Sequence, residues 1–460
     1  MGRDLRSWIA ELEAADELLH IRKPVDPETQ MGALLYQSRE KGLLFEEVVG
    51  HPGWRVLGQA PANLRHAAVA FDTDLQGLIP KIAKLMDRRM EPKLVTGGPV
   101  KEIVQTGDEV NLQEIPAHIA GSRDAGPFIA SGLAVSRDPD TGCRNVSFHR
   151  LQIKGRNRTG ALLVPRHTFR NFQKYETKGE PMPIAFFIGH HPLYYMAAAT
   201  TGPYGMDEFD VAGGFLGEPV PLVKCETVDL EVPADAEIVI EGHVLPGVRE
   251  HEGPFSEFHD YYVAGSGDNP VIEYTAITRR HDAIYKAIQN GSEVEGCVFH
   301  RVPMAATVFR RLQNVGGFVD LKNVRTMPGV LGVVVQMTPR FHGEARQVLM
   351  AALSGEYLHQ KIAIAVDDDV NIYNDWEILW SLTTRVDPER DITVIPGVRG
   401  HPMDPTGVEF FSTGQVGWQR LGSKVLIDAT APPTSEPAER DVFSRIKPPG
   451  DGEVKLEDFL

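Results

Sequence analysis

Three segments near the middle of the chain alternate apolar and polar residues, and this pattern constrains the fold more than any other feature. The segments are 227–232 (TVDLEV), 237–244 (EIVIEGHV) and 270–278 (PVIEYTAIT). Side chains that repeat every second position face one side of a strand, and the glycines and prolines between the segments favour turns. Prolines are also dense between residues 165 and 233, which favours loops over long helices. The middle of the chain is therefore predicted to be an antiparallel, largely β domain, either a barrel or a sandwich.

The two ends of the chain have different patterns. Residues 4–19 and 74–89 carry apolar side chains at helical spacing, although Pro80 lies inside the second segment. Short apolar runs typical of buried strands follow residue 300, at 329–338, 361–370 and 424–430. A helical segment, 343–354, separates the first two of these runs, so an α/β layer arrangement is predicted for this part of the chain.

Size and charge narrow the range of functions. A chain of 460 residues is too long for one core, so two or three domains are expected. Its 47 Lys and Arg against 63 Asp and Glu give a net charge of −16, which provides no global attraction for nucleic acid or anionic lipid. No run of about 18 apolar residues suggests a membrane span, and the acidic N-terminus lacks the apolar core of a signal peptide. Three scattered cysteines without a CxxC motif indicate reduced thiols, and the protein is predicted to be cytoplasmic.

Residues 250–262 (EHEGPFSEFHDYY) place two carboxylates close together on a stiff turn. Glu252 and Glu257 are five residues apart, and Gly253-Pro254 between them restricts the backbone. A carboxylate pair suits general acid–base chemistry when the surroundings separate the two pKa values. Two glutamates in a loop are more often simply solvated. A glycosidase would also use two carboxylates, but nothing else in the sequence suggests a sugar cleft.

A second cluster, NVSFHR, contains Asn145 and Arg150. The alternation of Val146 and Phe148 with polar residues predicts a strand, on which Asn145 and Arg150 would face opposite sides because their spacing is odd. A bulge or the end of the strand is needed to bring them together. The planar fork of arginine is the side chain best suited to hold a carboxylate through two parallel hydrogen bonds.

Two further motifs add possible metal ligands. LLVPRHTFRNF contains His167, and MDEFDVAGGFLGEPV contains Glu208. With Asn145 they supply an imidazole nitrogen, a carboxylate and an amide oxygen. Such a mixed nitrogen and oxygen set suits Mn²⁺ or Mg²⁺ better than structural zinc.

The order of these motifs resembles that of the UbiD family, the decarboxylases that use prenylated flavin mononucleotide (FMN). The resemblance covers roughly residues 5–430 and runs through NVSFHR, PRH, DEFDVAGG, KCETVDLEVPADAEIVIEGHV, EGPFSE and RVDPERD. It implies an α+β multidomain fold with an N-terminal α+β region (1–105) and a split β-barrel flavin-binding domain (106–298). It also implies a C-terminal α/β oligomerisation domain (299–440), and residues 441–460 are read as a tail that docks on another surface, such as a second subunit.

The resemblance also implies roles for individual residues. Arg150, Glu252 and Glu257 match the catalytic network, with Glu257 as the proton donor. Asn145, His167 and Glu208 match the positions that bind Mn²⁺, which holds the cofactor phosphate with a K⁺ ion close by. Those three and Arg150 are expected to contact the cofactor, as are Ser147, Phe148, His149, Leu163, Val164, Pro165, Arg166 and Lys361. One departure is Ser256, where the family usually has glycine before the acid.

The substrate side is expected to be polar. His401 and Met403, in VRGHPMDP, fall where relatives line the substrate pocket, and Asn290 falls where hydroxybenzoate or heteroaromatic acid decarboxylases place a polar residue. A polar wall favours a ring that bears a hydroxyl group or a heteroatom. In the alternative interpretation, His401 only caps a turn before Pro402. Phe255, Phe258, Tyr261 and Tyr262 are expected to keep the site dry.

The leading hypothesis is a reversible, non-oxidative decarboxylase of a hydroxybenzoate-like or pyrrole- or furan-carboxylate-like acid. The implied partners are the acid itself, CO₂, a flavin prenyltransferase that supplies the cofactor, and further copies of the chain in a homodimer or homohexamer. A cinnamic-type acrylic acid decarboxylase of the same family is the alternative. A metal-dependent hydrolase using Asn145, His167 and Glu208 and a non-catalytic assembly subunit are weaker alternatives.

Overall fold

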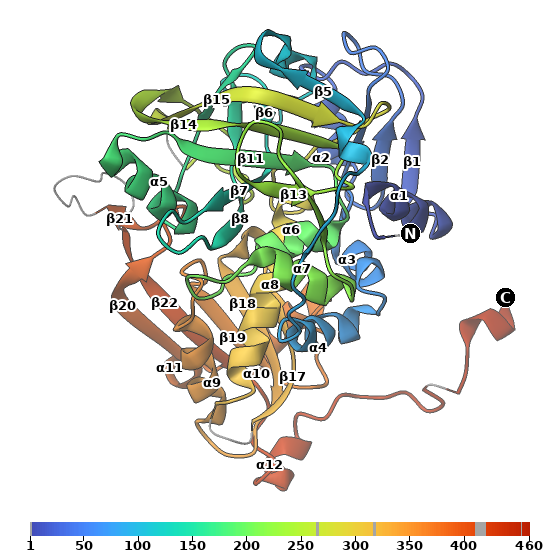
Figure 1. Cartoon of the computed structure of the whole chain (residues 1–460). Coiled ribbons are helices and arrows are strands. Elements are labelled where there is room, and N and C mark those ends of the chain that lie inside the picture. Colours follow the sequence, from blue (N-terminus) through green and yellow to red (C-terminus); the bar gives the residue numbers. More distant parts are fainter. Residues whose placement is uncertain (1, 264–265, 316–318, 410–419, 452) are drawn as a thin grey trace.

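The computed structural model describes residues 2–263, 266–315, 319–409, 420–451 and 453–460 (Figure 1). Within this part of the chain the largest sheet has nine strands, and its strands pair antiparallel. Its main path runs β6-β9-β10-β15-β14-β11-β7-β8, and β5 pairs with β15. The bounds are β5 Ile103–Thr106, β6 Phe128–Ile129, β7 Leu133–Arg137, β8 Arg144–Phe148, β9 Leu151–Ile153, β10 Arg158–Ala161, β11 Met182–Ile188, β14 Ile238–Glu252 and β15 Gly267–Arg279. The antiparallel β domain predicted from the alternating pattern is confirmed.

Strands β14 and β15 form a hairpin much longer than the predicted segments 237–244 and 270–278. Their pairing continues to its tip, where Glu252 lies opposite Gly267. The register shifts between Val244 and Arg249, so the outer half of the hairpin is offset from the inner half. The regular apolar alternation stops near this shift, which is why the sequence pattern showed only the inner half.

The predicted strand at 227–232 is largely wrong. Only its last two residues belong to a strand, β13 (Glu231–Pro233), which pairs with β12 (Pro221–Lys224) beside β4 (Lys93–Leu94). The backbone amides of Glu226 and Thr227 donate to the carboxylate of Glu241 instead of to a neighbouring strand. Val228 and Leu230 are still buried, so a turn produces the same apolar alternation as a strand.

The N-terminal part combines four helices with a four-stranded sheet of order β1-β2-β3-β16 in the described residues. The helices are α1 Leu5–Ala14, α2 Met31–Gln37, α3 Leu64–Ala70 and α4 Leu75–Leu85; the strands are β1 Leu18–Ile21, β2 Gly42–Phe45, β3 Arg55–Gly58 and β16 Ile284–Lys286. The helix predicted over 4–19 ends at Ala14, because Asp16 adopts a left-handed conformation (φ 55°) and β1 follows.

Helix α4 confirms the prediction for 74–89 in most of its length and contains Pro80. A proline has no N–H group, so the carbonyl four residues earlier, Gln76, loses its helical donor. The side-chain amide of Asn323 donates to this carbonyl at 3.0 Å and replaces the missing bond. This contact explains how a buried helix tolerates a proline in its interior.

The C-terminal part is an α/β layer, as predicted. Its described sheet runs β17-β18-β19-β22-β20, with β21 beside β22; β18, β19 and β22 are parallel, and β17 and β20 pair antiparallel at the edges. The strands are β17 Asp320–Thr326, β18 Gly332–Thr338, β19 Ile362–Val366, β20 Ile392–Gly400, β21 Val408–Glu409 and β22 Arg420–Ala429, and the helices are α9 Glu344–Leu353, α10 Asp375–Arg385, α11 Pro388–Asp391 and α12 Pro437–Asp441. Strand β18 starts later than predicted because Gly329 and Val330 have positive φ angles.

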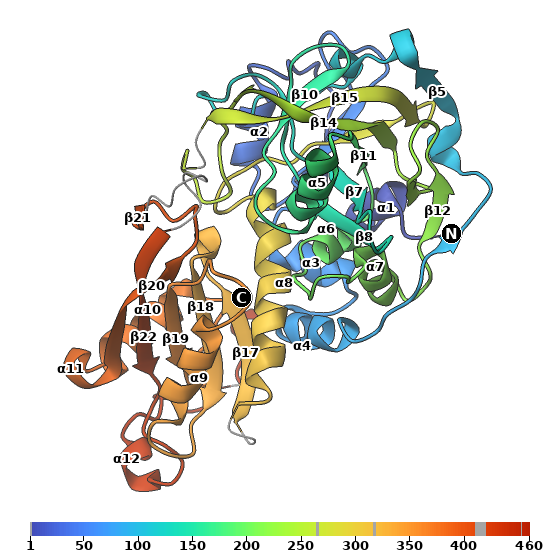
Figure 2. The same cartoon turned by 60° about the vertical axis from the view of Figure 1, so that its left-hand side comes forward.

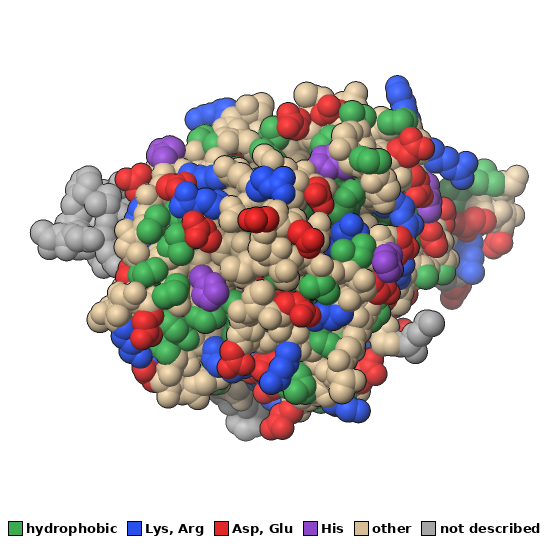
Figure 3. Space-filling model, turned by 45° about the horizontal axis from the view of Figure 1, so that its top comes forward, with side chains coloured by type: hydrophobic (Ala, Val, Ile, Leu, Met, Phe, Trp, Pro, Cys, Tyr) green, Lys and Arg blue, Asp and Glu red, His purple; other side chains and the backbone are tan. Residues whose placement is uncertain are grey.

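Helix α8 (Glu295–Leu312) lies between the central part and the C-terminal sheet (Figure 2). Most of its residues are buried because both parts pack against it. Beyond α12 the tail runs away from the body (Figure 1), and Ile446 and Leu460 are almost fully exposed. On the face shown in Figure 3, acidic and basic side chains are interspersed. In the described ranges, no helix has both the length and the apolar character needed to cross a membrane.

Candidate active site

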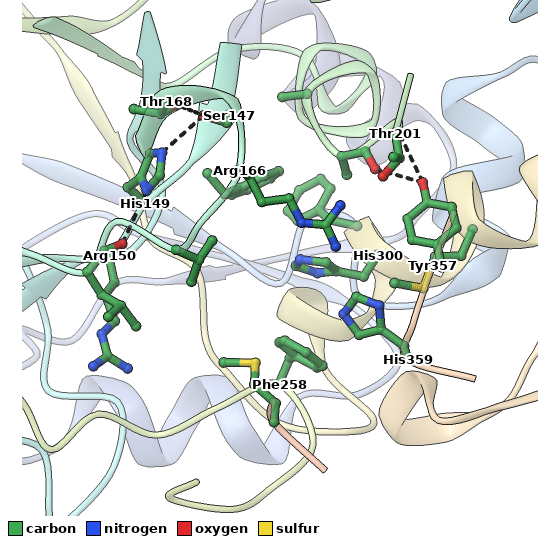
Figure 4. A pocket seen from close by; sticks show the side chains of 18 of the residues that line it. Ser147, His149, Arg150, Arg166, Thr168, Thr201, Phe258, His300, Tyr357 and His359 are labelled. Carbon is green, nitrogen blue, oxygen red and sulfur yellow. Dashed lines mark hydrogen bonds between the residues drawn. The ribbon is translucent and has the colours of Figure 1, made fainter. Parts of the chain in front are cut away.

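A cavity of about 490 Å³ opens between the large antiparallel sheet and the C-terminal part. Its walls come from β8 and the residues after it, the start of helix α5 (His167–Lys178), the segment between α6 (Pro192–Ala198) and α7 (Glu208–Leu216), the loop 253–262, helix α8, and the segments 357–359 and 399–403. Figure 4 shows how side chains from these elements converge. A volume of this size is typical of a small-molecule or cofactor site.

Arg150 lies at the centre of a buried ionic network. Its Nε and Nη2 donate to the two carboxylate oxygens of Glu252, each at 2.9 Å, and its Nη1 donates to Glu257 Oε1 at 2.7 Å. Arg150 is 8% exposed and Glu252 is fully buried. Glu252 also accepts a bond from Asn269 at 2.9 Å. Strand β8 ends at Phe148, so Arg150 and Asn145 can share the cavity despite their odd spacing, as the sequence required.

The turn after Glu252 places Glu257 against the same arginine. Gly253 has a φ of 86°, which a residue with a Cβ atom rarely adopts, and its N–H donates to Gln152 Oε1 at 3.1 Å. The Phe255 ring lies 5.2 Å from the guanidinium carbon of Arg150 and covers it. Phe255 and Phe258 are buried as expected, whereas Tyr261 is 57% exposed and does not shield the site.

Two carboxylates share one arginine, and this arrangement shifts the titration of Glu257. Burial raises the pKa of Glu257 to about 8; Arg150 opposes this shift and Glu252 adds to it. A buried cluster of one cation and two carboxylates would otherwise carry a net negative charge. Glu257 is therefore protonated near neutral pH and can serve as an acid.

Asn145, His167 and Glu208 all line the cavity, on another part of its wall. Asn145 belongs to β8, and His167 and Glu208 are the first residues of α5 and α7. The amide nitrogen of Asn145 donates to Ser147 at 3.1 Å and Thr168 at 2.9 Å, so the amide oxygen is the atom that could bind a cation. Glu208 accepts the Val146 N–H at 2.7 Å.

The charge states of these residues fit a divalent cation. Burial and the neighbouring Arg166 and Arg170 lower the pKa of His167, so the imidazole is neutral. Burial raises the pKa of Glu208 to about 8, and a cation beside it would favour the carboxylate again. Among the described residues, no three His, Cys, Asp or Glu side chains converge as a metal site, so this set depends on the amide of Asn145.

The surrounding wall fits a planar aromatic cofactor. Phe148, Leu162 and Val164 supply apolar surface. His149 donates from Nδ1 to the Leu162 carbonyl at 3.3 Å, and its Nε2 accepts from Ser147 at 3.0 Å (Figure 4). Burial lowers the pKa of His149 to about 4, which keeps this ring neutral. Apolar walls with a few fixed polar groups are the usual composition of a cofactor site.

Most of the predicted cofactor contacts line the cavity, and two do not. The lining includes Ser147, Phe148, His149, Val164, Pro165 and Arg166. Leu163 is buried in the core beside β10 and β11, and Leu162 faces the cavity in its place. The Lys361 ammonium lies outside the lining, where it donates to Asp404 at 2.8 Å and to Thr406 at 2.9 Å.

The predicted substrate residues Asn290, His401 and Met403 all line the cavity. Asn290 donates to the carbonyl of Ser256 at 2.9 Å, so it also holds the loop that carries Glu257. His401 accepts the Met403 N–H at 3.2 Å and so caps the turn. It also lines the cavity, so the two interpretations of this residue are compatible.

Two further histidines of the cavity, His300 and His359, were missed in the sequence. The His359 ring stacks on His401 with centroids 3.5 Å apart, and His300 stacks on Phe258 at 4.9 Å. Burial lowers the pKa of each of these three histidines, so the rings are neutral. His300 and His359 are each an isolated histidine beside apolar residues, a pattern that sequence reasoning normally assigns to the core.

Three domain models of one family match the chain. The 3-octaprenyl-4-hydroxybenzoate carboxy-lyase N-terminal domain matches residues 9–86, the Rift-related domain of the same enzyme matches 93–293, and its C-terminal domain matches 297–429. The chain is 37% identical over 339 residues to the anhydromevalonate phosphate decarboxylase of Methanothermobacter thermautotrophicus, a match that covers 73% of this chain and 76% of that protein.

Solved structures give the same result over the full length. The UbiD-class enzyme HmfF from Pelotomaculum thermopropionicum in complex with FMN has a TM-score of 0.90 at 36% identity, covering 99% of this chain and 100% of that one. An evolved dimeric form of HmfF with prenylated FMN has a TM-score of 0.88 at 35% identity, covering 100% of both. The apo 3,4-dihydroxybenzoic acid decarboxylase AroY of Klebsiella pneumoniae has a TM-score of 0.88 at 30% identity, covering 99% of both.

Proposed function

Because the chain belongs to the UbiD family of carboxy-lyases, we propose that it catalyses the reversible, non-oxidative decarboxylation of an aromatic or heteroaromatic acid with prenylated FMN as cofactor. The observation that carries this proposal is the buried network of Arg150, Glu252 and Glu257 at the cavity wall. It combines a cation for the substrate carboxylate with a carboxyl group that is protonated near neutral pH.

Each member of the network has a separate task in this proposal. Glu252 holds Arg150 through two parallel bonds and keeps its fork oriented. Arg150 meets the carboxylate of the incoming acid. When CO₂ departs, the carbon–carboxylate bond breaks and its electron pair stays on the substrate; Glu257 then donates its proton and the new carbon–hydrogen bond forms. Prenylated FMN, when bound, supplies the electron sink for that pair. Carboxylation follows the same steps in reverse.

In this proposal a second part of the cavity wall binds the cofactor. Asn145, His167 and Glu208 would hold Mn²⁺ and, through it, the cofactor phosphate, with K⁺ as a second ion close by. The neutral His149 and the apolar wall around it would face the flavin ring. A separate flavin prenyltransferase would supply the cofactor, and the protein would act as a homodimer or homohexamer.

The substrate side favours a ring with a hydroxyl group or heteroatom, because Asn290 and His401 would otherwise leave polar groups against an apolar ring. An acrylic-type acid remains the alternative substrate within the family. The anhydromevalonate phosphate decarboxylase favours it, because the name of that relative gives a phosphorylated mevalonate derivative as the substrate. Arg166 and Arg399 line the cavity and could meet a phosphate group.

The test is expression with and without a flavin prenyltransferase, followed by an absorbance spectrum and an assay of CO₂ release. The panel contains hydroxybenzoates, pyrrole and furan carboxylates, cinnamates and a phosphorylated unsaturated acid. We expect a coloured protein whose activity needs the prenyltransferase and is lost in Glu257→Gln. Turnover of only the cinnamates or the phosphorylated acid would select the acrylic-type alternative.

A colourless protein that ignores the prenyltransferase would contradict the decarboxylase proposal. Ester or amide hydrolysis by such a protein, lost in His167→Ala, would instead support a metal-dependent hydrolase. A coloured protein that is inactive on every acid, and becomes active only with added subunits, would support the assembly-subunit alternative.

A further inference from the structure

The loop 253–262, which carries Glu257, is anchored to the central part of the protein. The N–H of Ser256 donates to Asp124 at 2.7 Å, and the carbonyl of Ser256 accepts from Asn290 at 2.9 Å. Further along the loop, Asp260 accepts the Ser292 N–H at 2.9 Å. These bonds fix the backbone on either side of Glu257.

The two residues directly after Glu257 contact the C-terminal part instead. Phe258 packs in a small cluster with Cys297 and Met304 of helix α8, and with Val330, Tyr357 and Met403. His259 donates from Nε2 to the backbone carbonyl of Met403 at 2.7 Å and is only 4% exposed. Glu257 therefore lies between one anchor on the central part and another on the C-terminal part.

The bond from His259 has a defined direction. A carbonyl can only accept, so Nε2 carries the hydrogen and Nδ1 does not. Nδ1 is buried and has no hydrogen-bond partner among the described residues, and burial lowers the pKa of this ring. Burying the unpaired Nδ1 costs free energy, which indicates that the bond from Nε2 to Met403 has a role.

Met403 is held at its other end by a second histidine. Its N–H donates to His401 Nδ1 at 3.2 Å, and His401 stacks on His359. His401 and Met403 both face the cavity. The segment 401–403 and the loop of Glu257 are therefore joined through the Met403 peptide groups.

We propose that His259 is a positioning residue that couples the placement of the proton donor Glu257 to the seating of the cavity segment 401–403. This inference rests on the function proposed above. A proton donor must lie within hydrogen-bond distance of the atom it protonates. A misplacement of about 1 Å can lower the rate about 100-fold. The coupling would let Glu257 reach the reacting carbon only when the C-terminal wall of the cavity is in place.

Substituting His259 by glutamine or by asparagine distinguishes a role of its hydrogen bond from a role in packing alone. The amide nitrogen of glutamine can occupy the position of His259 Nε2, whereas that of asparagine reaches only the position of Nδ1. In the holoenzyme, we expect kcat of His259→Gln to stay within about threefold of the wild type. We expect kcat of His259→Asn to fall by about 10- to 100-fold, with a smaller change in KM.

The solvent deuterium isotope effect on kcat gives a second readout. Poor placement of Glu257 makes proton transfer slower relative to the other steps, so the effect should increase in His259→Asn and in His259→Phe but not in His259→Gln. A purely structural loss would lower the amount of active enzyme and leave the isotope effect unchanged. Equal kcat and isotope effects in the glutamine and asparagine variants would overturn the proposal.

Hydrogen exchange tests the coupling even if no substrate is found. In the holoenzyme, exchange in 252–262 and in 401–407 should increase together in His259→Asn and stay at the wild-type level in His259→Gln. Tyr357→Phe is the comparison, because it keeps the ring that packs with Phe258 and removes only the hydroxyl that bonds Ala199 and Thr201. It should leave exchange in 252–262 unchanged. Increased exchange in 401–407 alone for His259→Asn would refute the coupling, whereas an inactive wild type with coupled exchange would refute only the decarboxylase.

Discussion

At the scale of single residues, the central feature is one arginine shared by two carboxylates. Glu252 engages Arg150 with both oxygens, and Glu257 engages it with one. The geometry assigns Glu252 to holding the arginine and leaves Glu257 the freer of the two. Burial and the neighbouring carboxylate of Glu252 both raise the pKa of Glu257, because a second buried negative charge beside one arginine is costly.

The raised pKa of Glu257 predicts a pH dependence. A carboxyl group with a pKa of about 8 is protonated below that pH and loses its proton as the pH rises through it. In the proposed mechanism decarboxylation needs the protonated form of Glu257, so its rate should fall above about pH 8, whereas carboxylation needs the ionised form and its rate should rise. A pH–rate profile of both directions checks this. An unchanged alkaline limb in a residually active Glu257→Asp enzyme would assign the limb to another group.

The two parallel bonds from Arg150 predict that lysine cannot replace it. A lysine keeps the charge but makes no bidentate contact, so Glu252 would lose one of its bonds. We expect Arg150→Lys to lower kcat/KM by about 100-fold or more, on the scale of about 3 kcal/mol of transition-state stabilisation. Arg158→Lys is the matched control, because Arg158 is half-exposed and pairs with Glu250 at the surface. Equal activity of the two variants would argue against the proposed role of Arg150.

Sequence reasoning found most of the residues at the cavity but not all of them. Asn145, Arg150, His167, Glu208 and Glu257 could be singled out because each combines a reactive side chain with a motif of known order. His259, His300 and His359 could not, because their importance depends on contacts between segments that lie far apart in the chain, such as His259 with Met403. The position of Lys361 beside Asp404 likewise depends on a loop conformation that no local pattern encodes.

At the scale of elements, patterns predicted the type of structure better than its limits. The UbiD resemblance and the α+β multidomain fold are confirmed. Helix α9 matches its predicted range closely, whereas α1 is shorter than predicted and β14 is much longer. The positive φ angle of Asp16 follows the early end of α1. The side chain of Glu241 replaces a strand partner for the backbone of Thr227. The domain limits at 105, 298 and 440 stay a prediction.

The proline inside α4 predicts a stability effect far from the cavity. Asn323→Ala would leave the Gln76 carbonyl without its replacement donor, at a cost of about 1–3 kcal/mol. For a chain of 460 residues, the apparent melting temperature should fall by about 1–3 °C in a calorimetric or fluorescence scan. Asn314→Ala is the control, because Asn314 is exposed and the bond from its side chain to the Arg310 carbonyl is long, at 3.4 Å, so the change should be about 0.5 °C or less. Similar losses in both variants would contradict the interpretation.

At the scale of the whole molecule, the C-terminal tail is the least integrated part. Arg440 and Arg445 still pair with Asp367 and Asp369 of the body, but the apolar side chains of Ile446, Leu456 and Leu460 are exposed. A monomer rarely leaves a series of apolar residues on an extended segment, so the tail is expected to dock on a second copy of the chain.

Removing residues 447–460 tests this expectation. The body should keep its melting temperature at low concentration, because the deleted residues contribute nothing to the described core. Sedimentation velocity should show a shift toward smaller species. An unchanged oligomeric state would show that the tail does not take part in assembly.

Glu252 closes the strand ladder of the long hairpin, whereas Glu257 lies five residues further on, in a loop. The two carboxylates that share Arg150 therefore differ in how much change the chain around them can accept. Substitutions within 255–262 change the position of the Glu257 carboxyl group and one wall of the cavity, while Glu252 at the end of the sheet still holds Arg150. Natural selection, or a laboratory library confined to this loop, could therefore change which carboxylic acid substrate is accepted. Arg150, which would bind the carboxylate of any such substrate, and its partner Glu252 would stay unchanged.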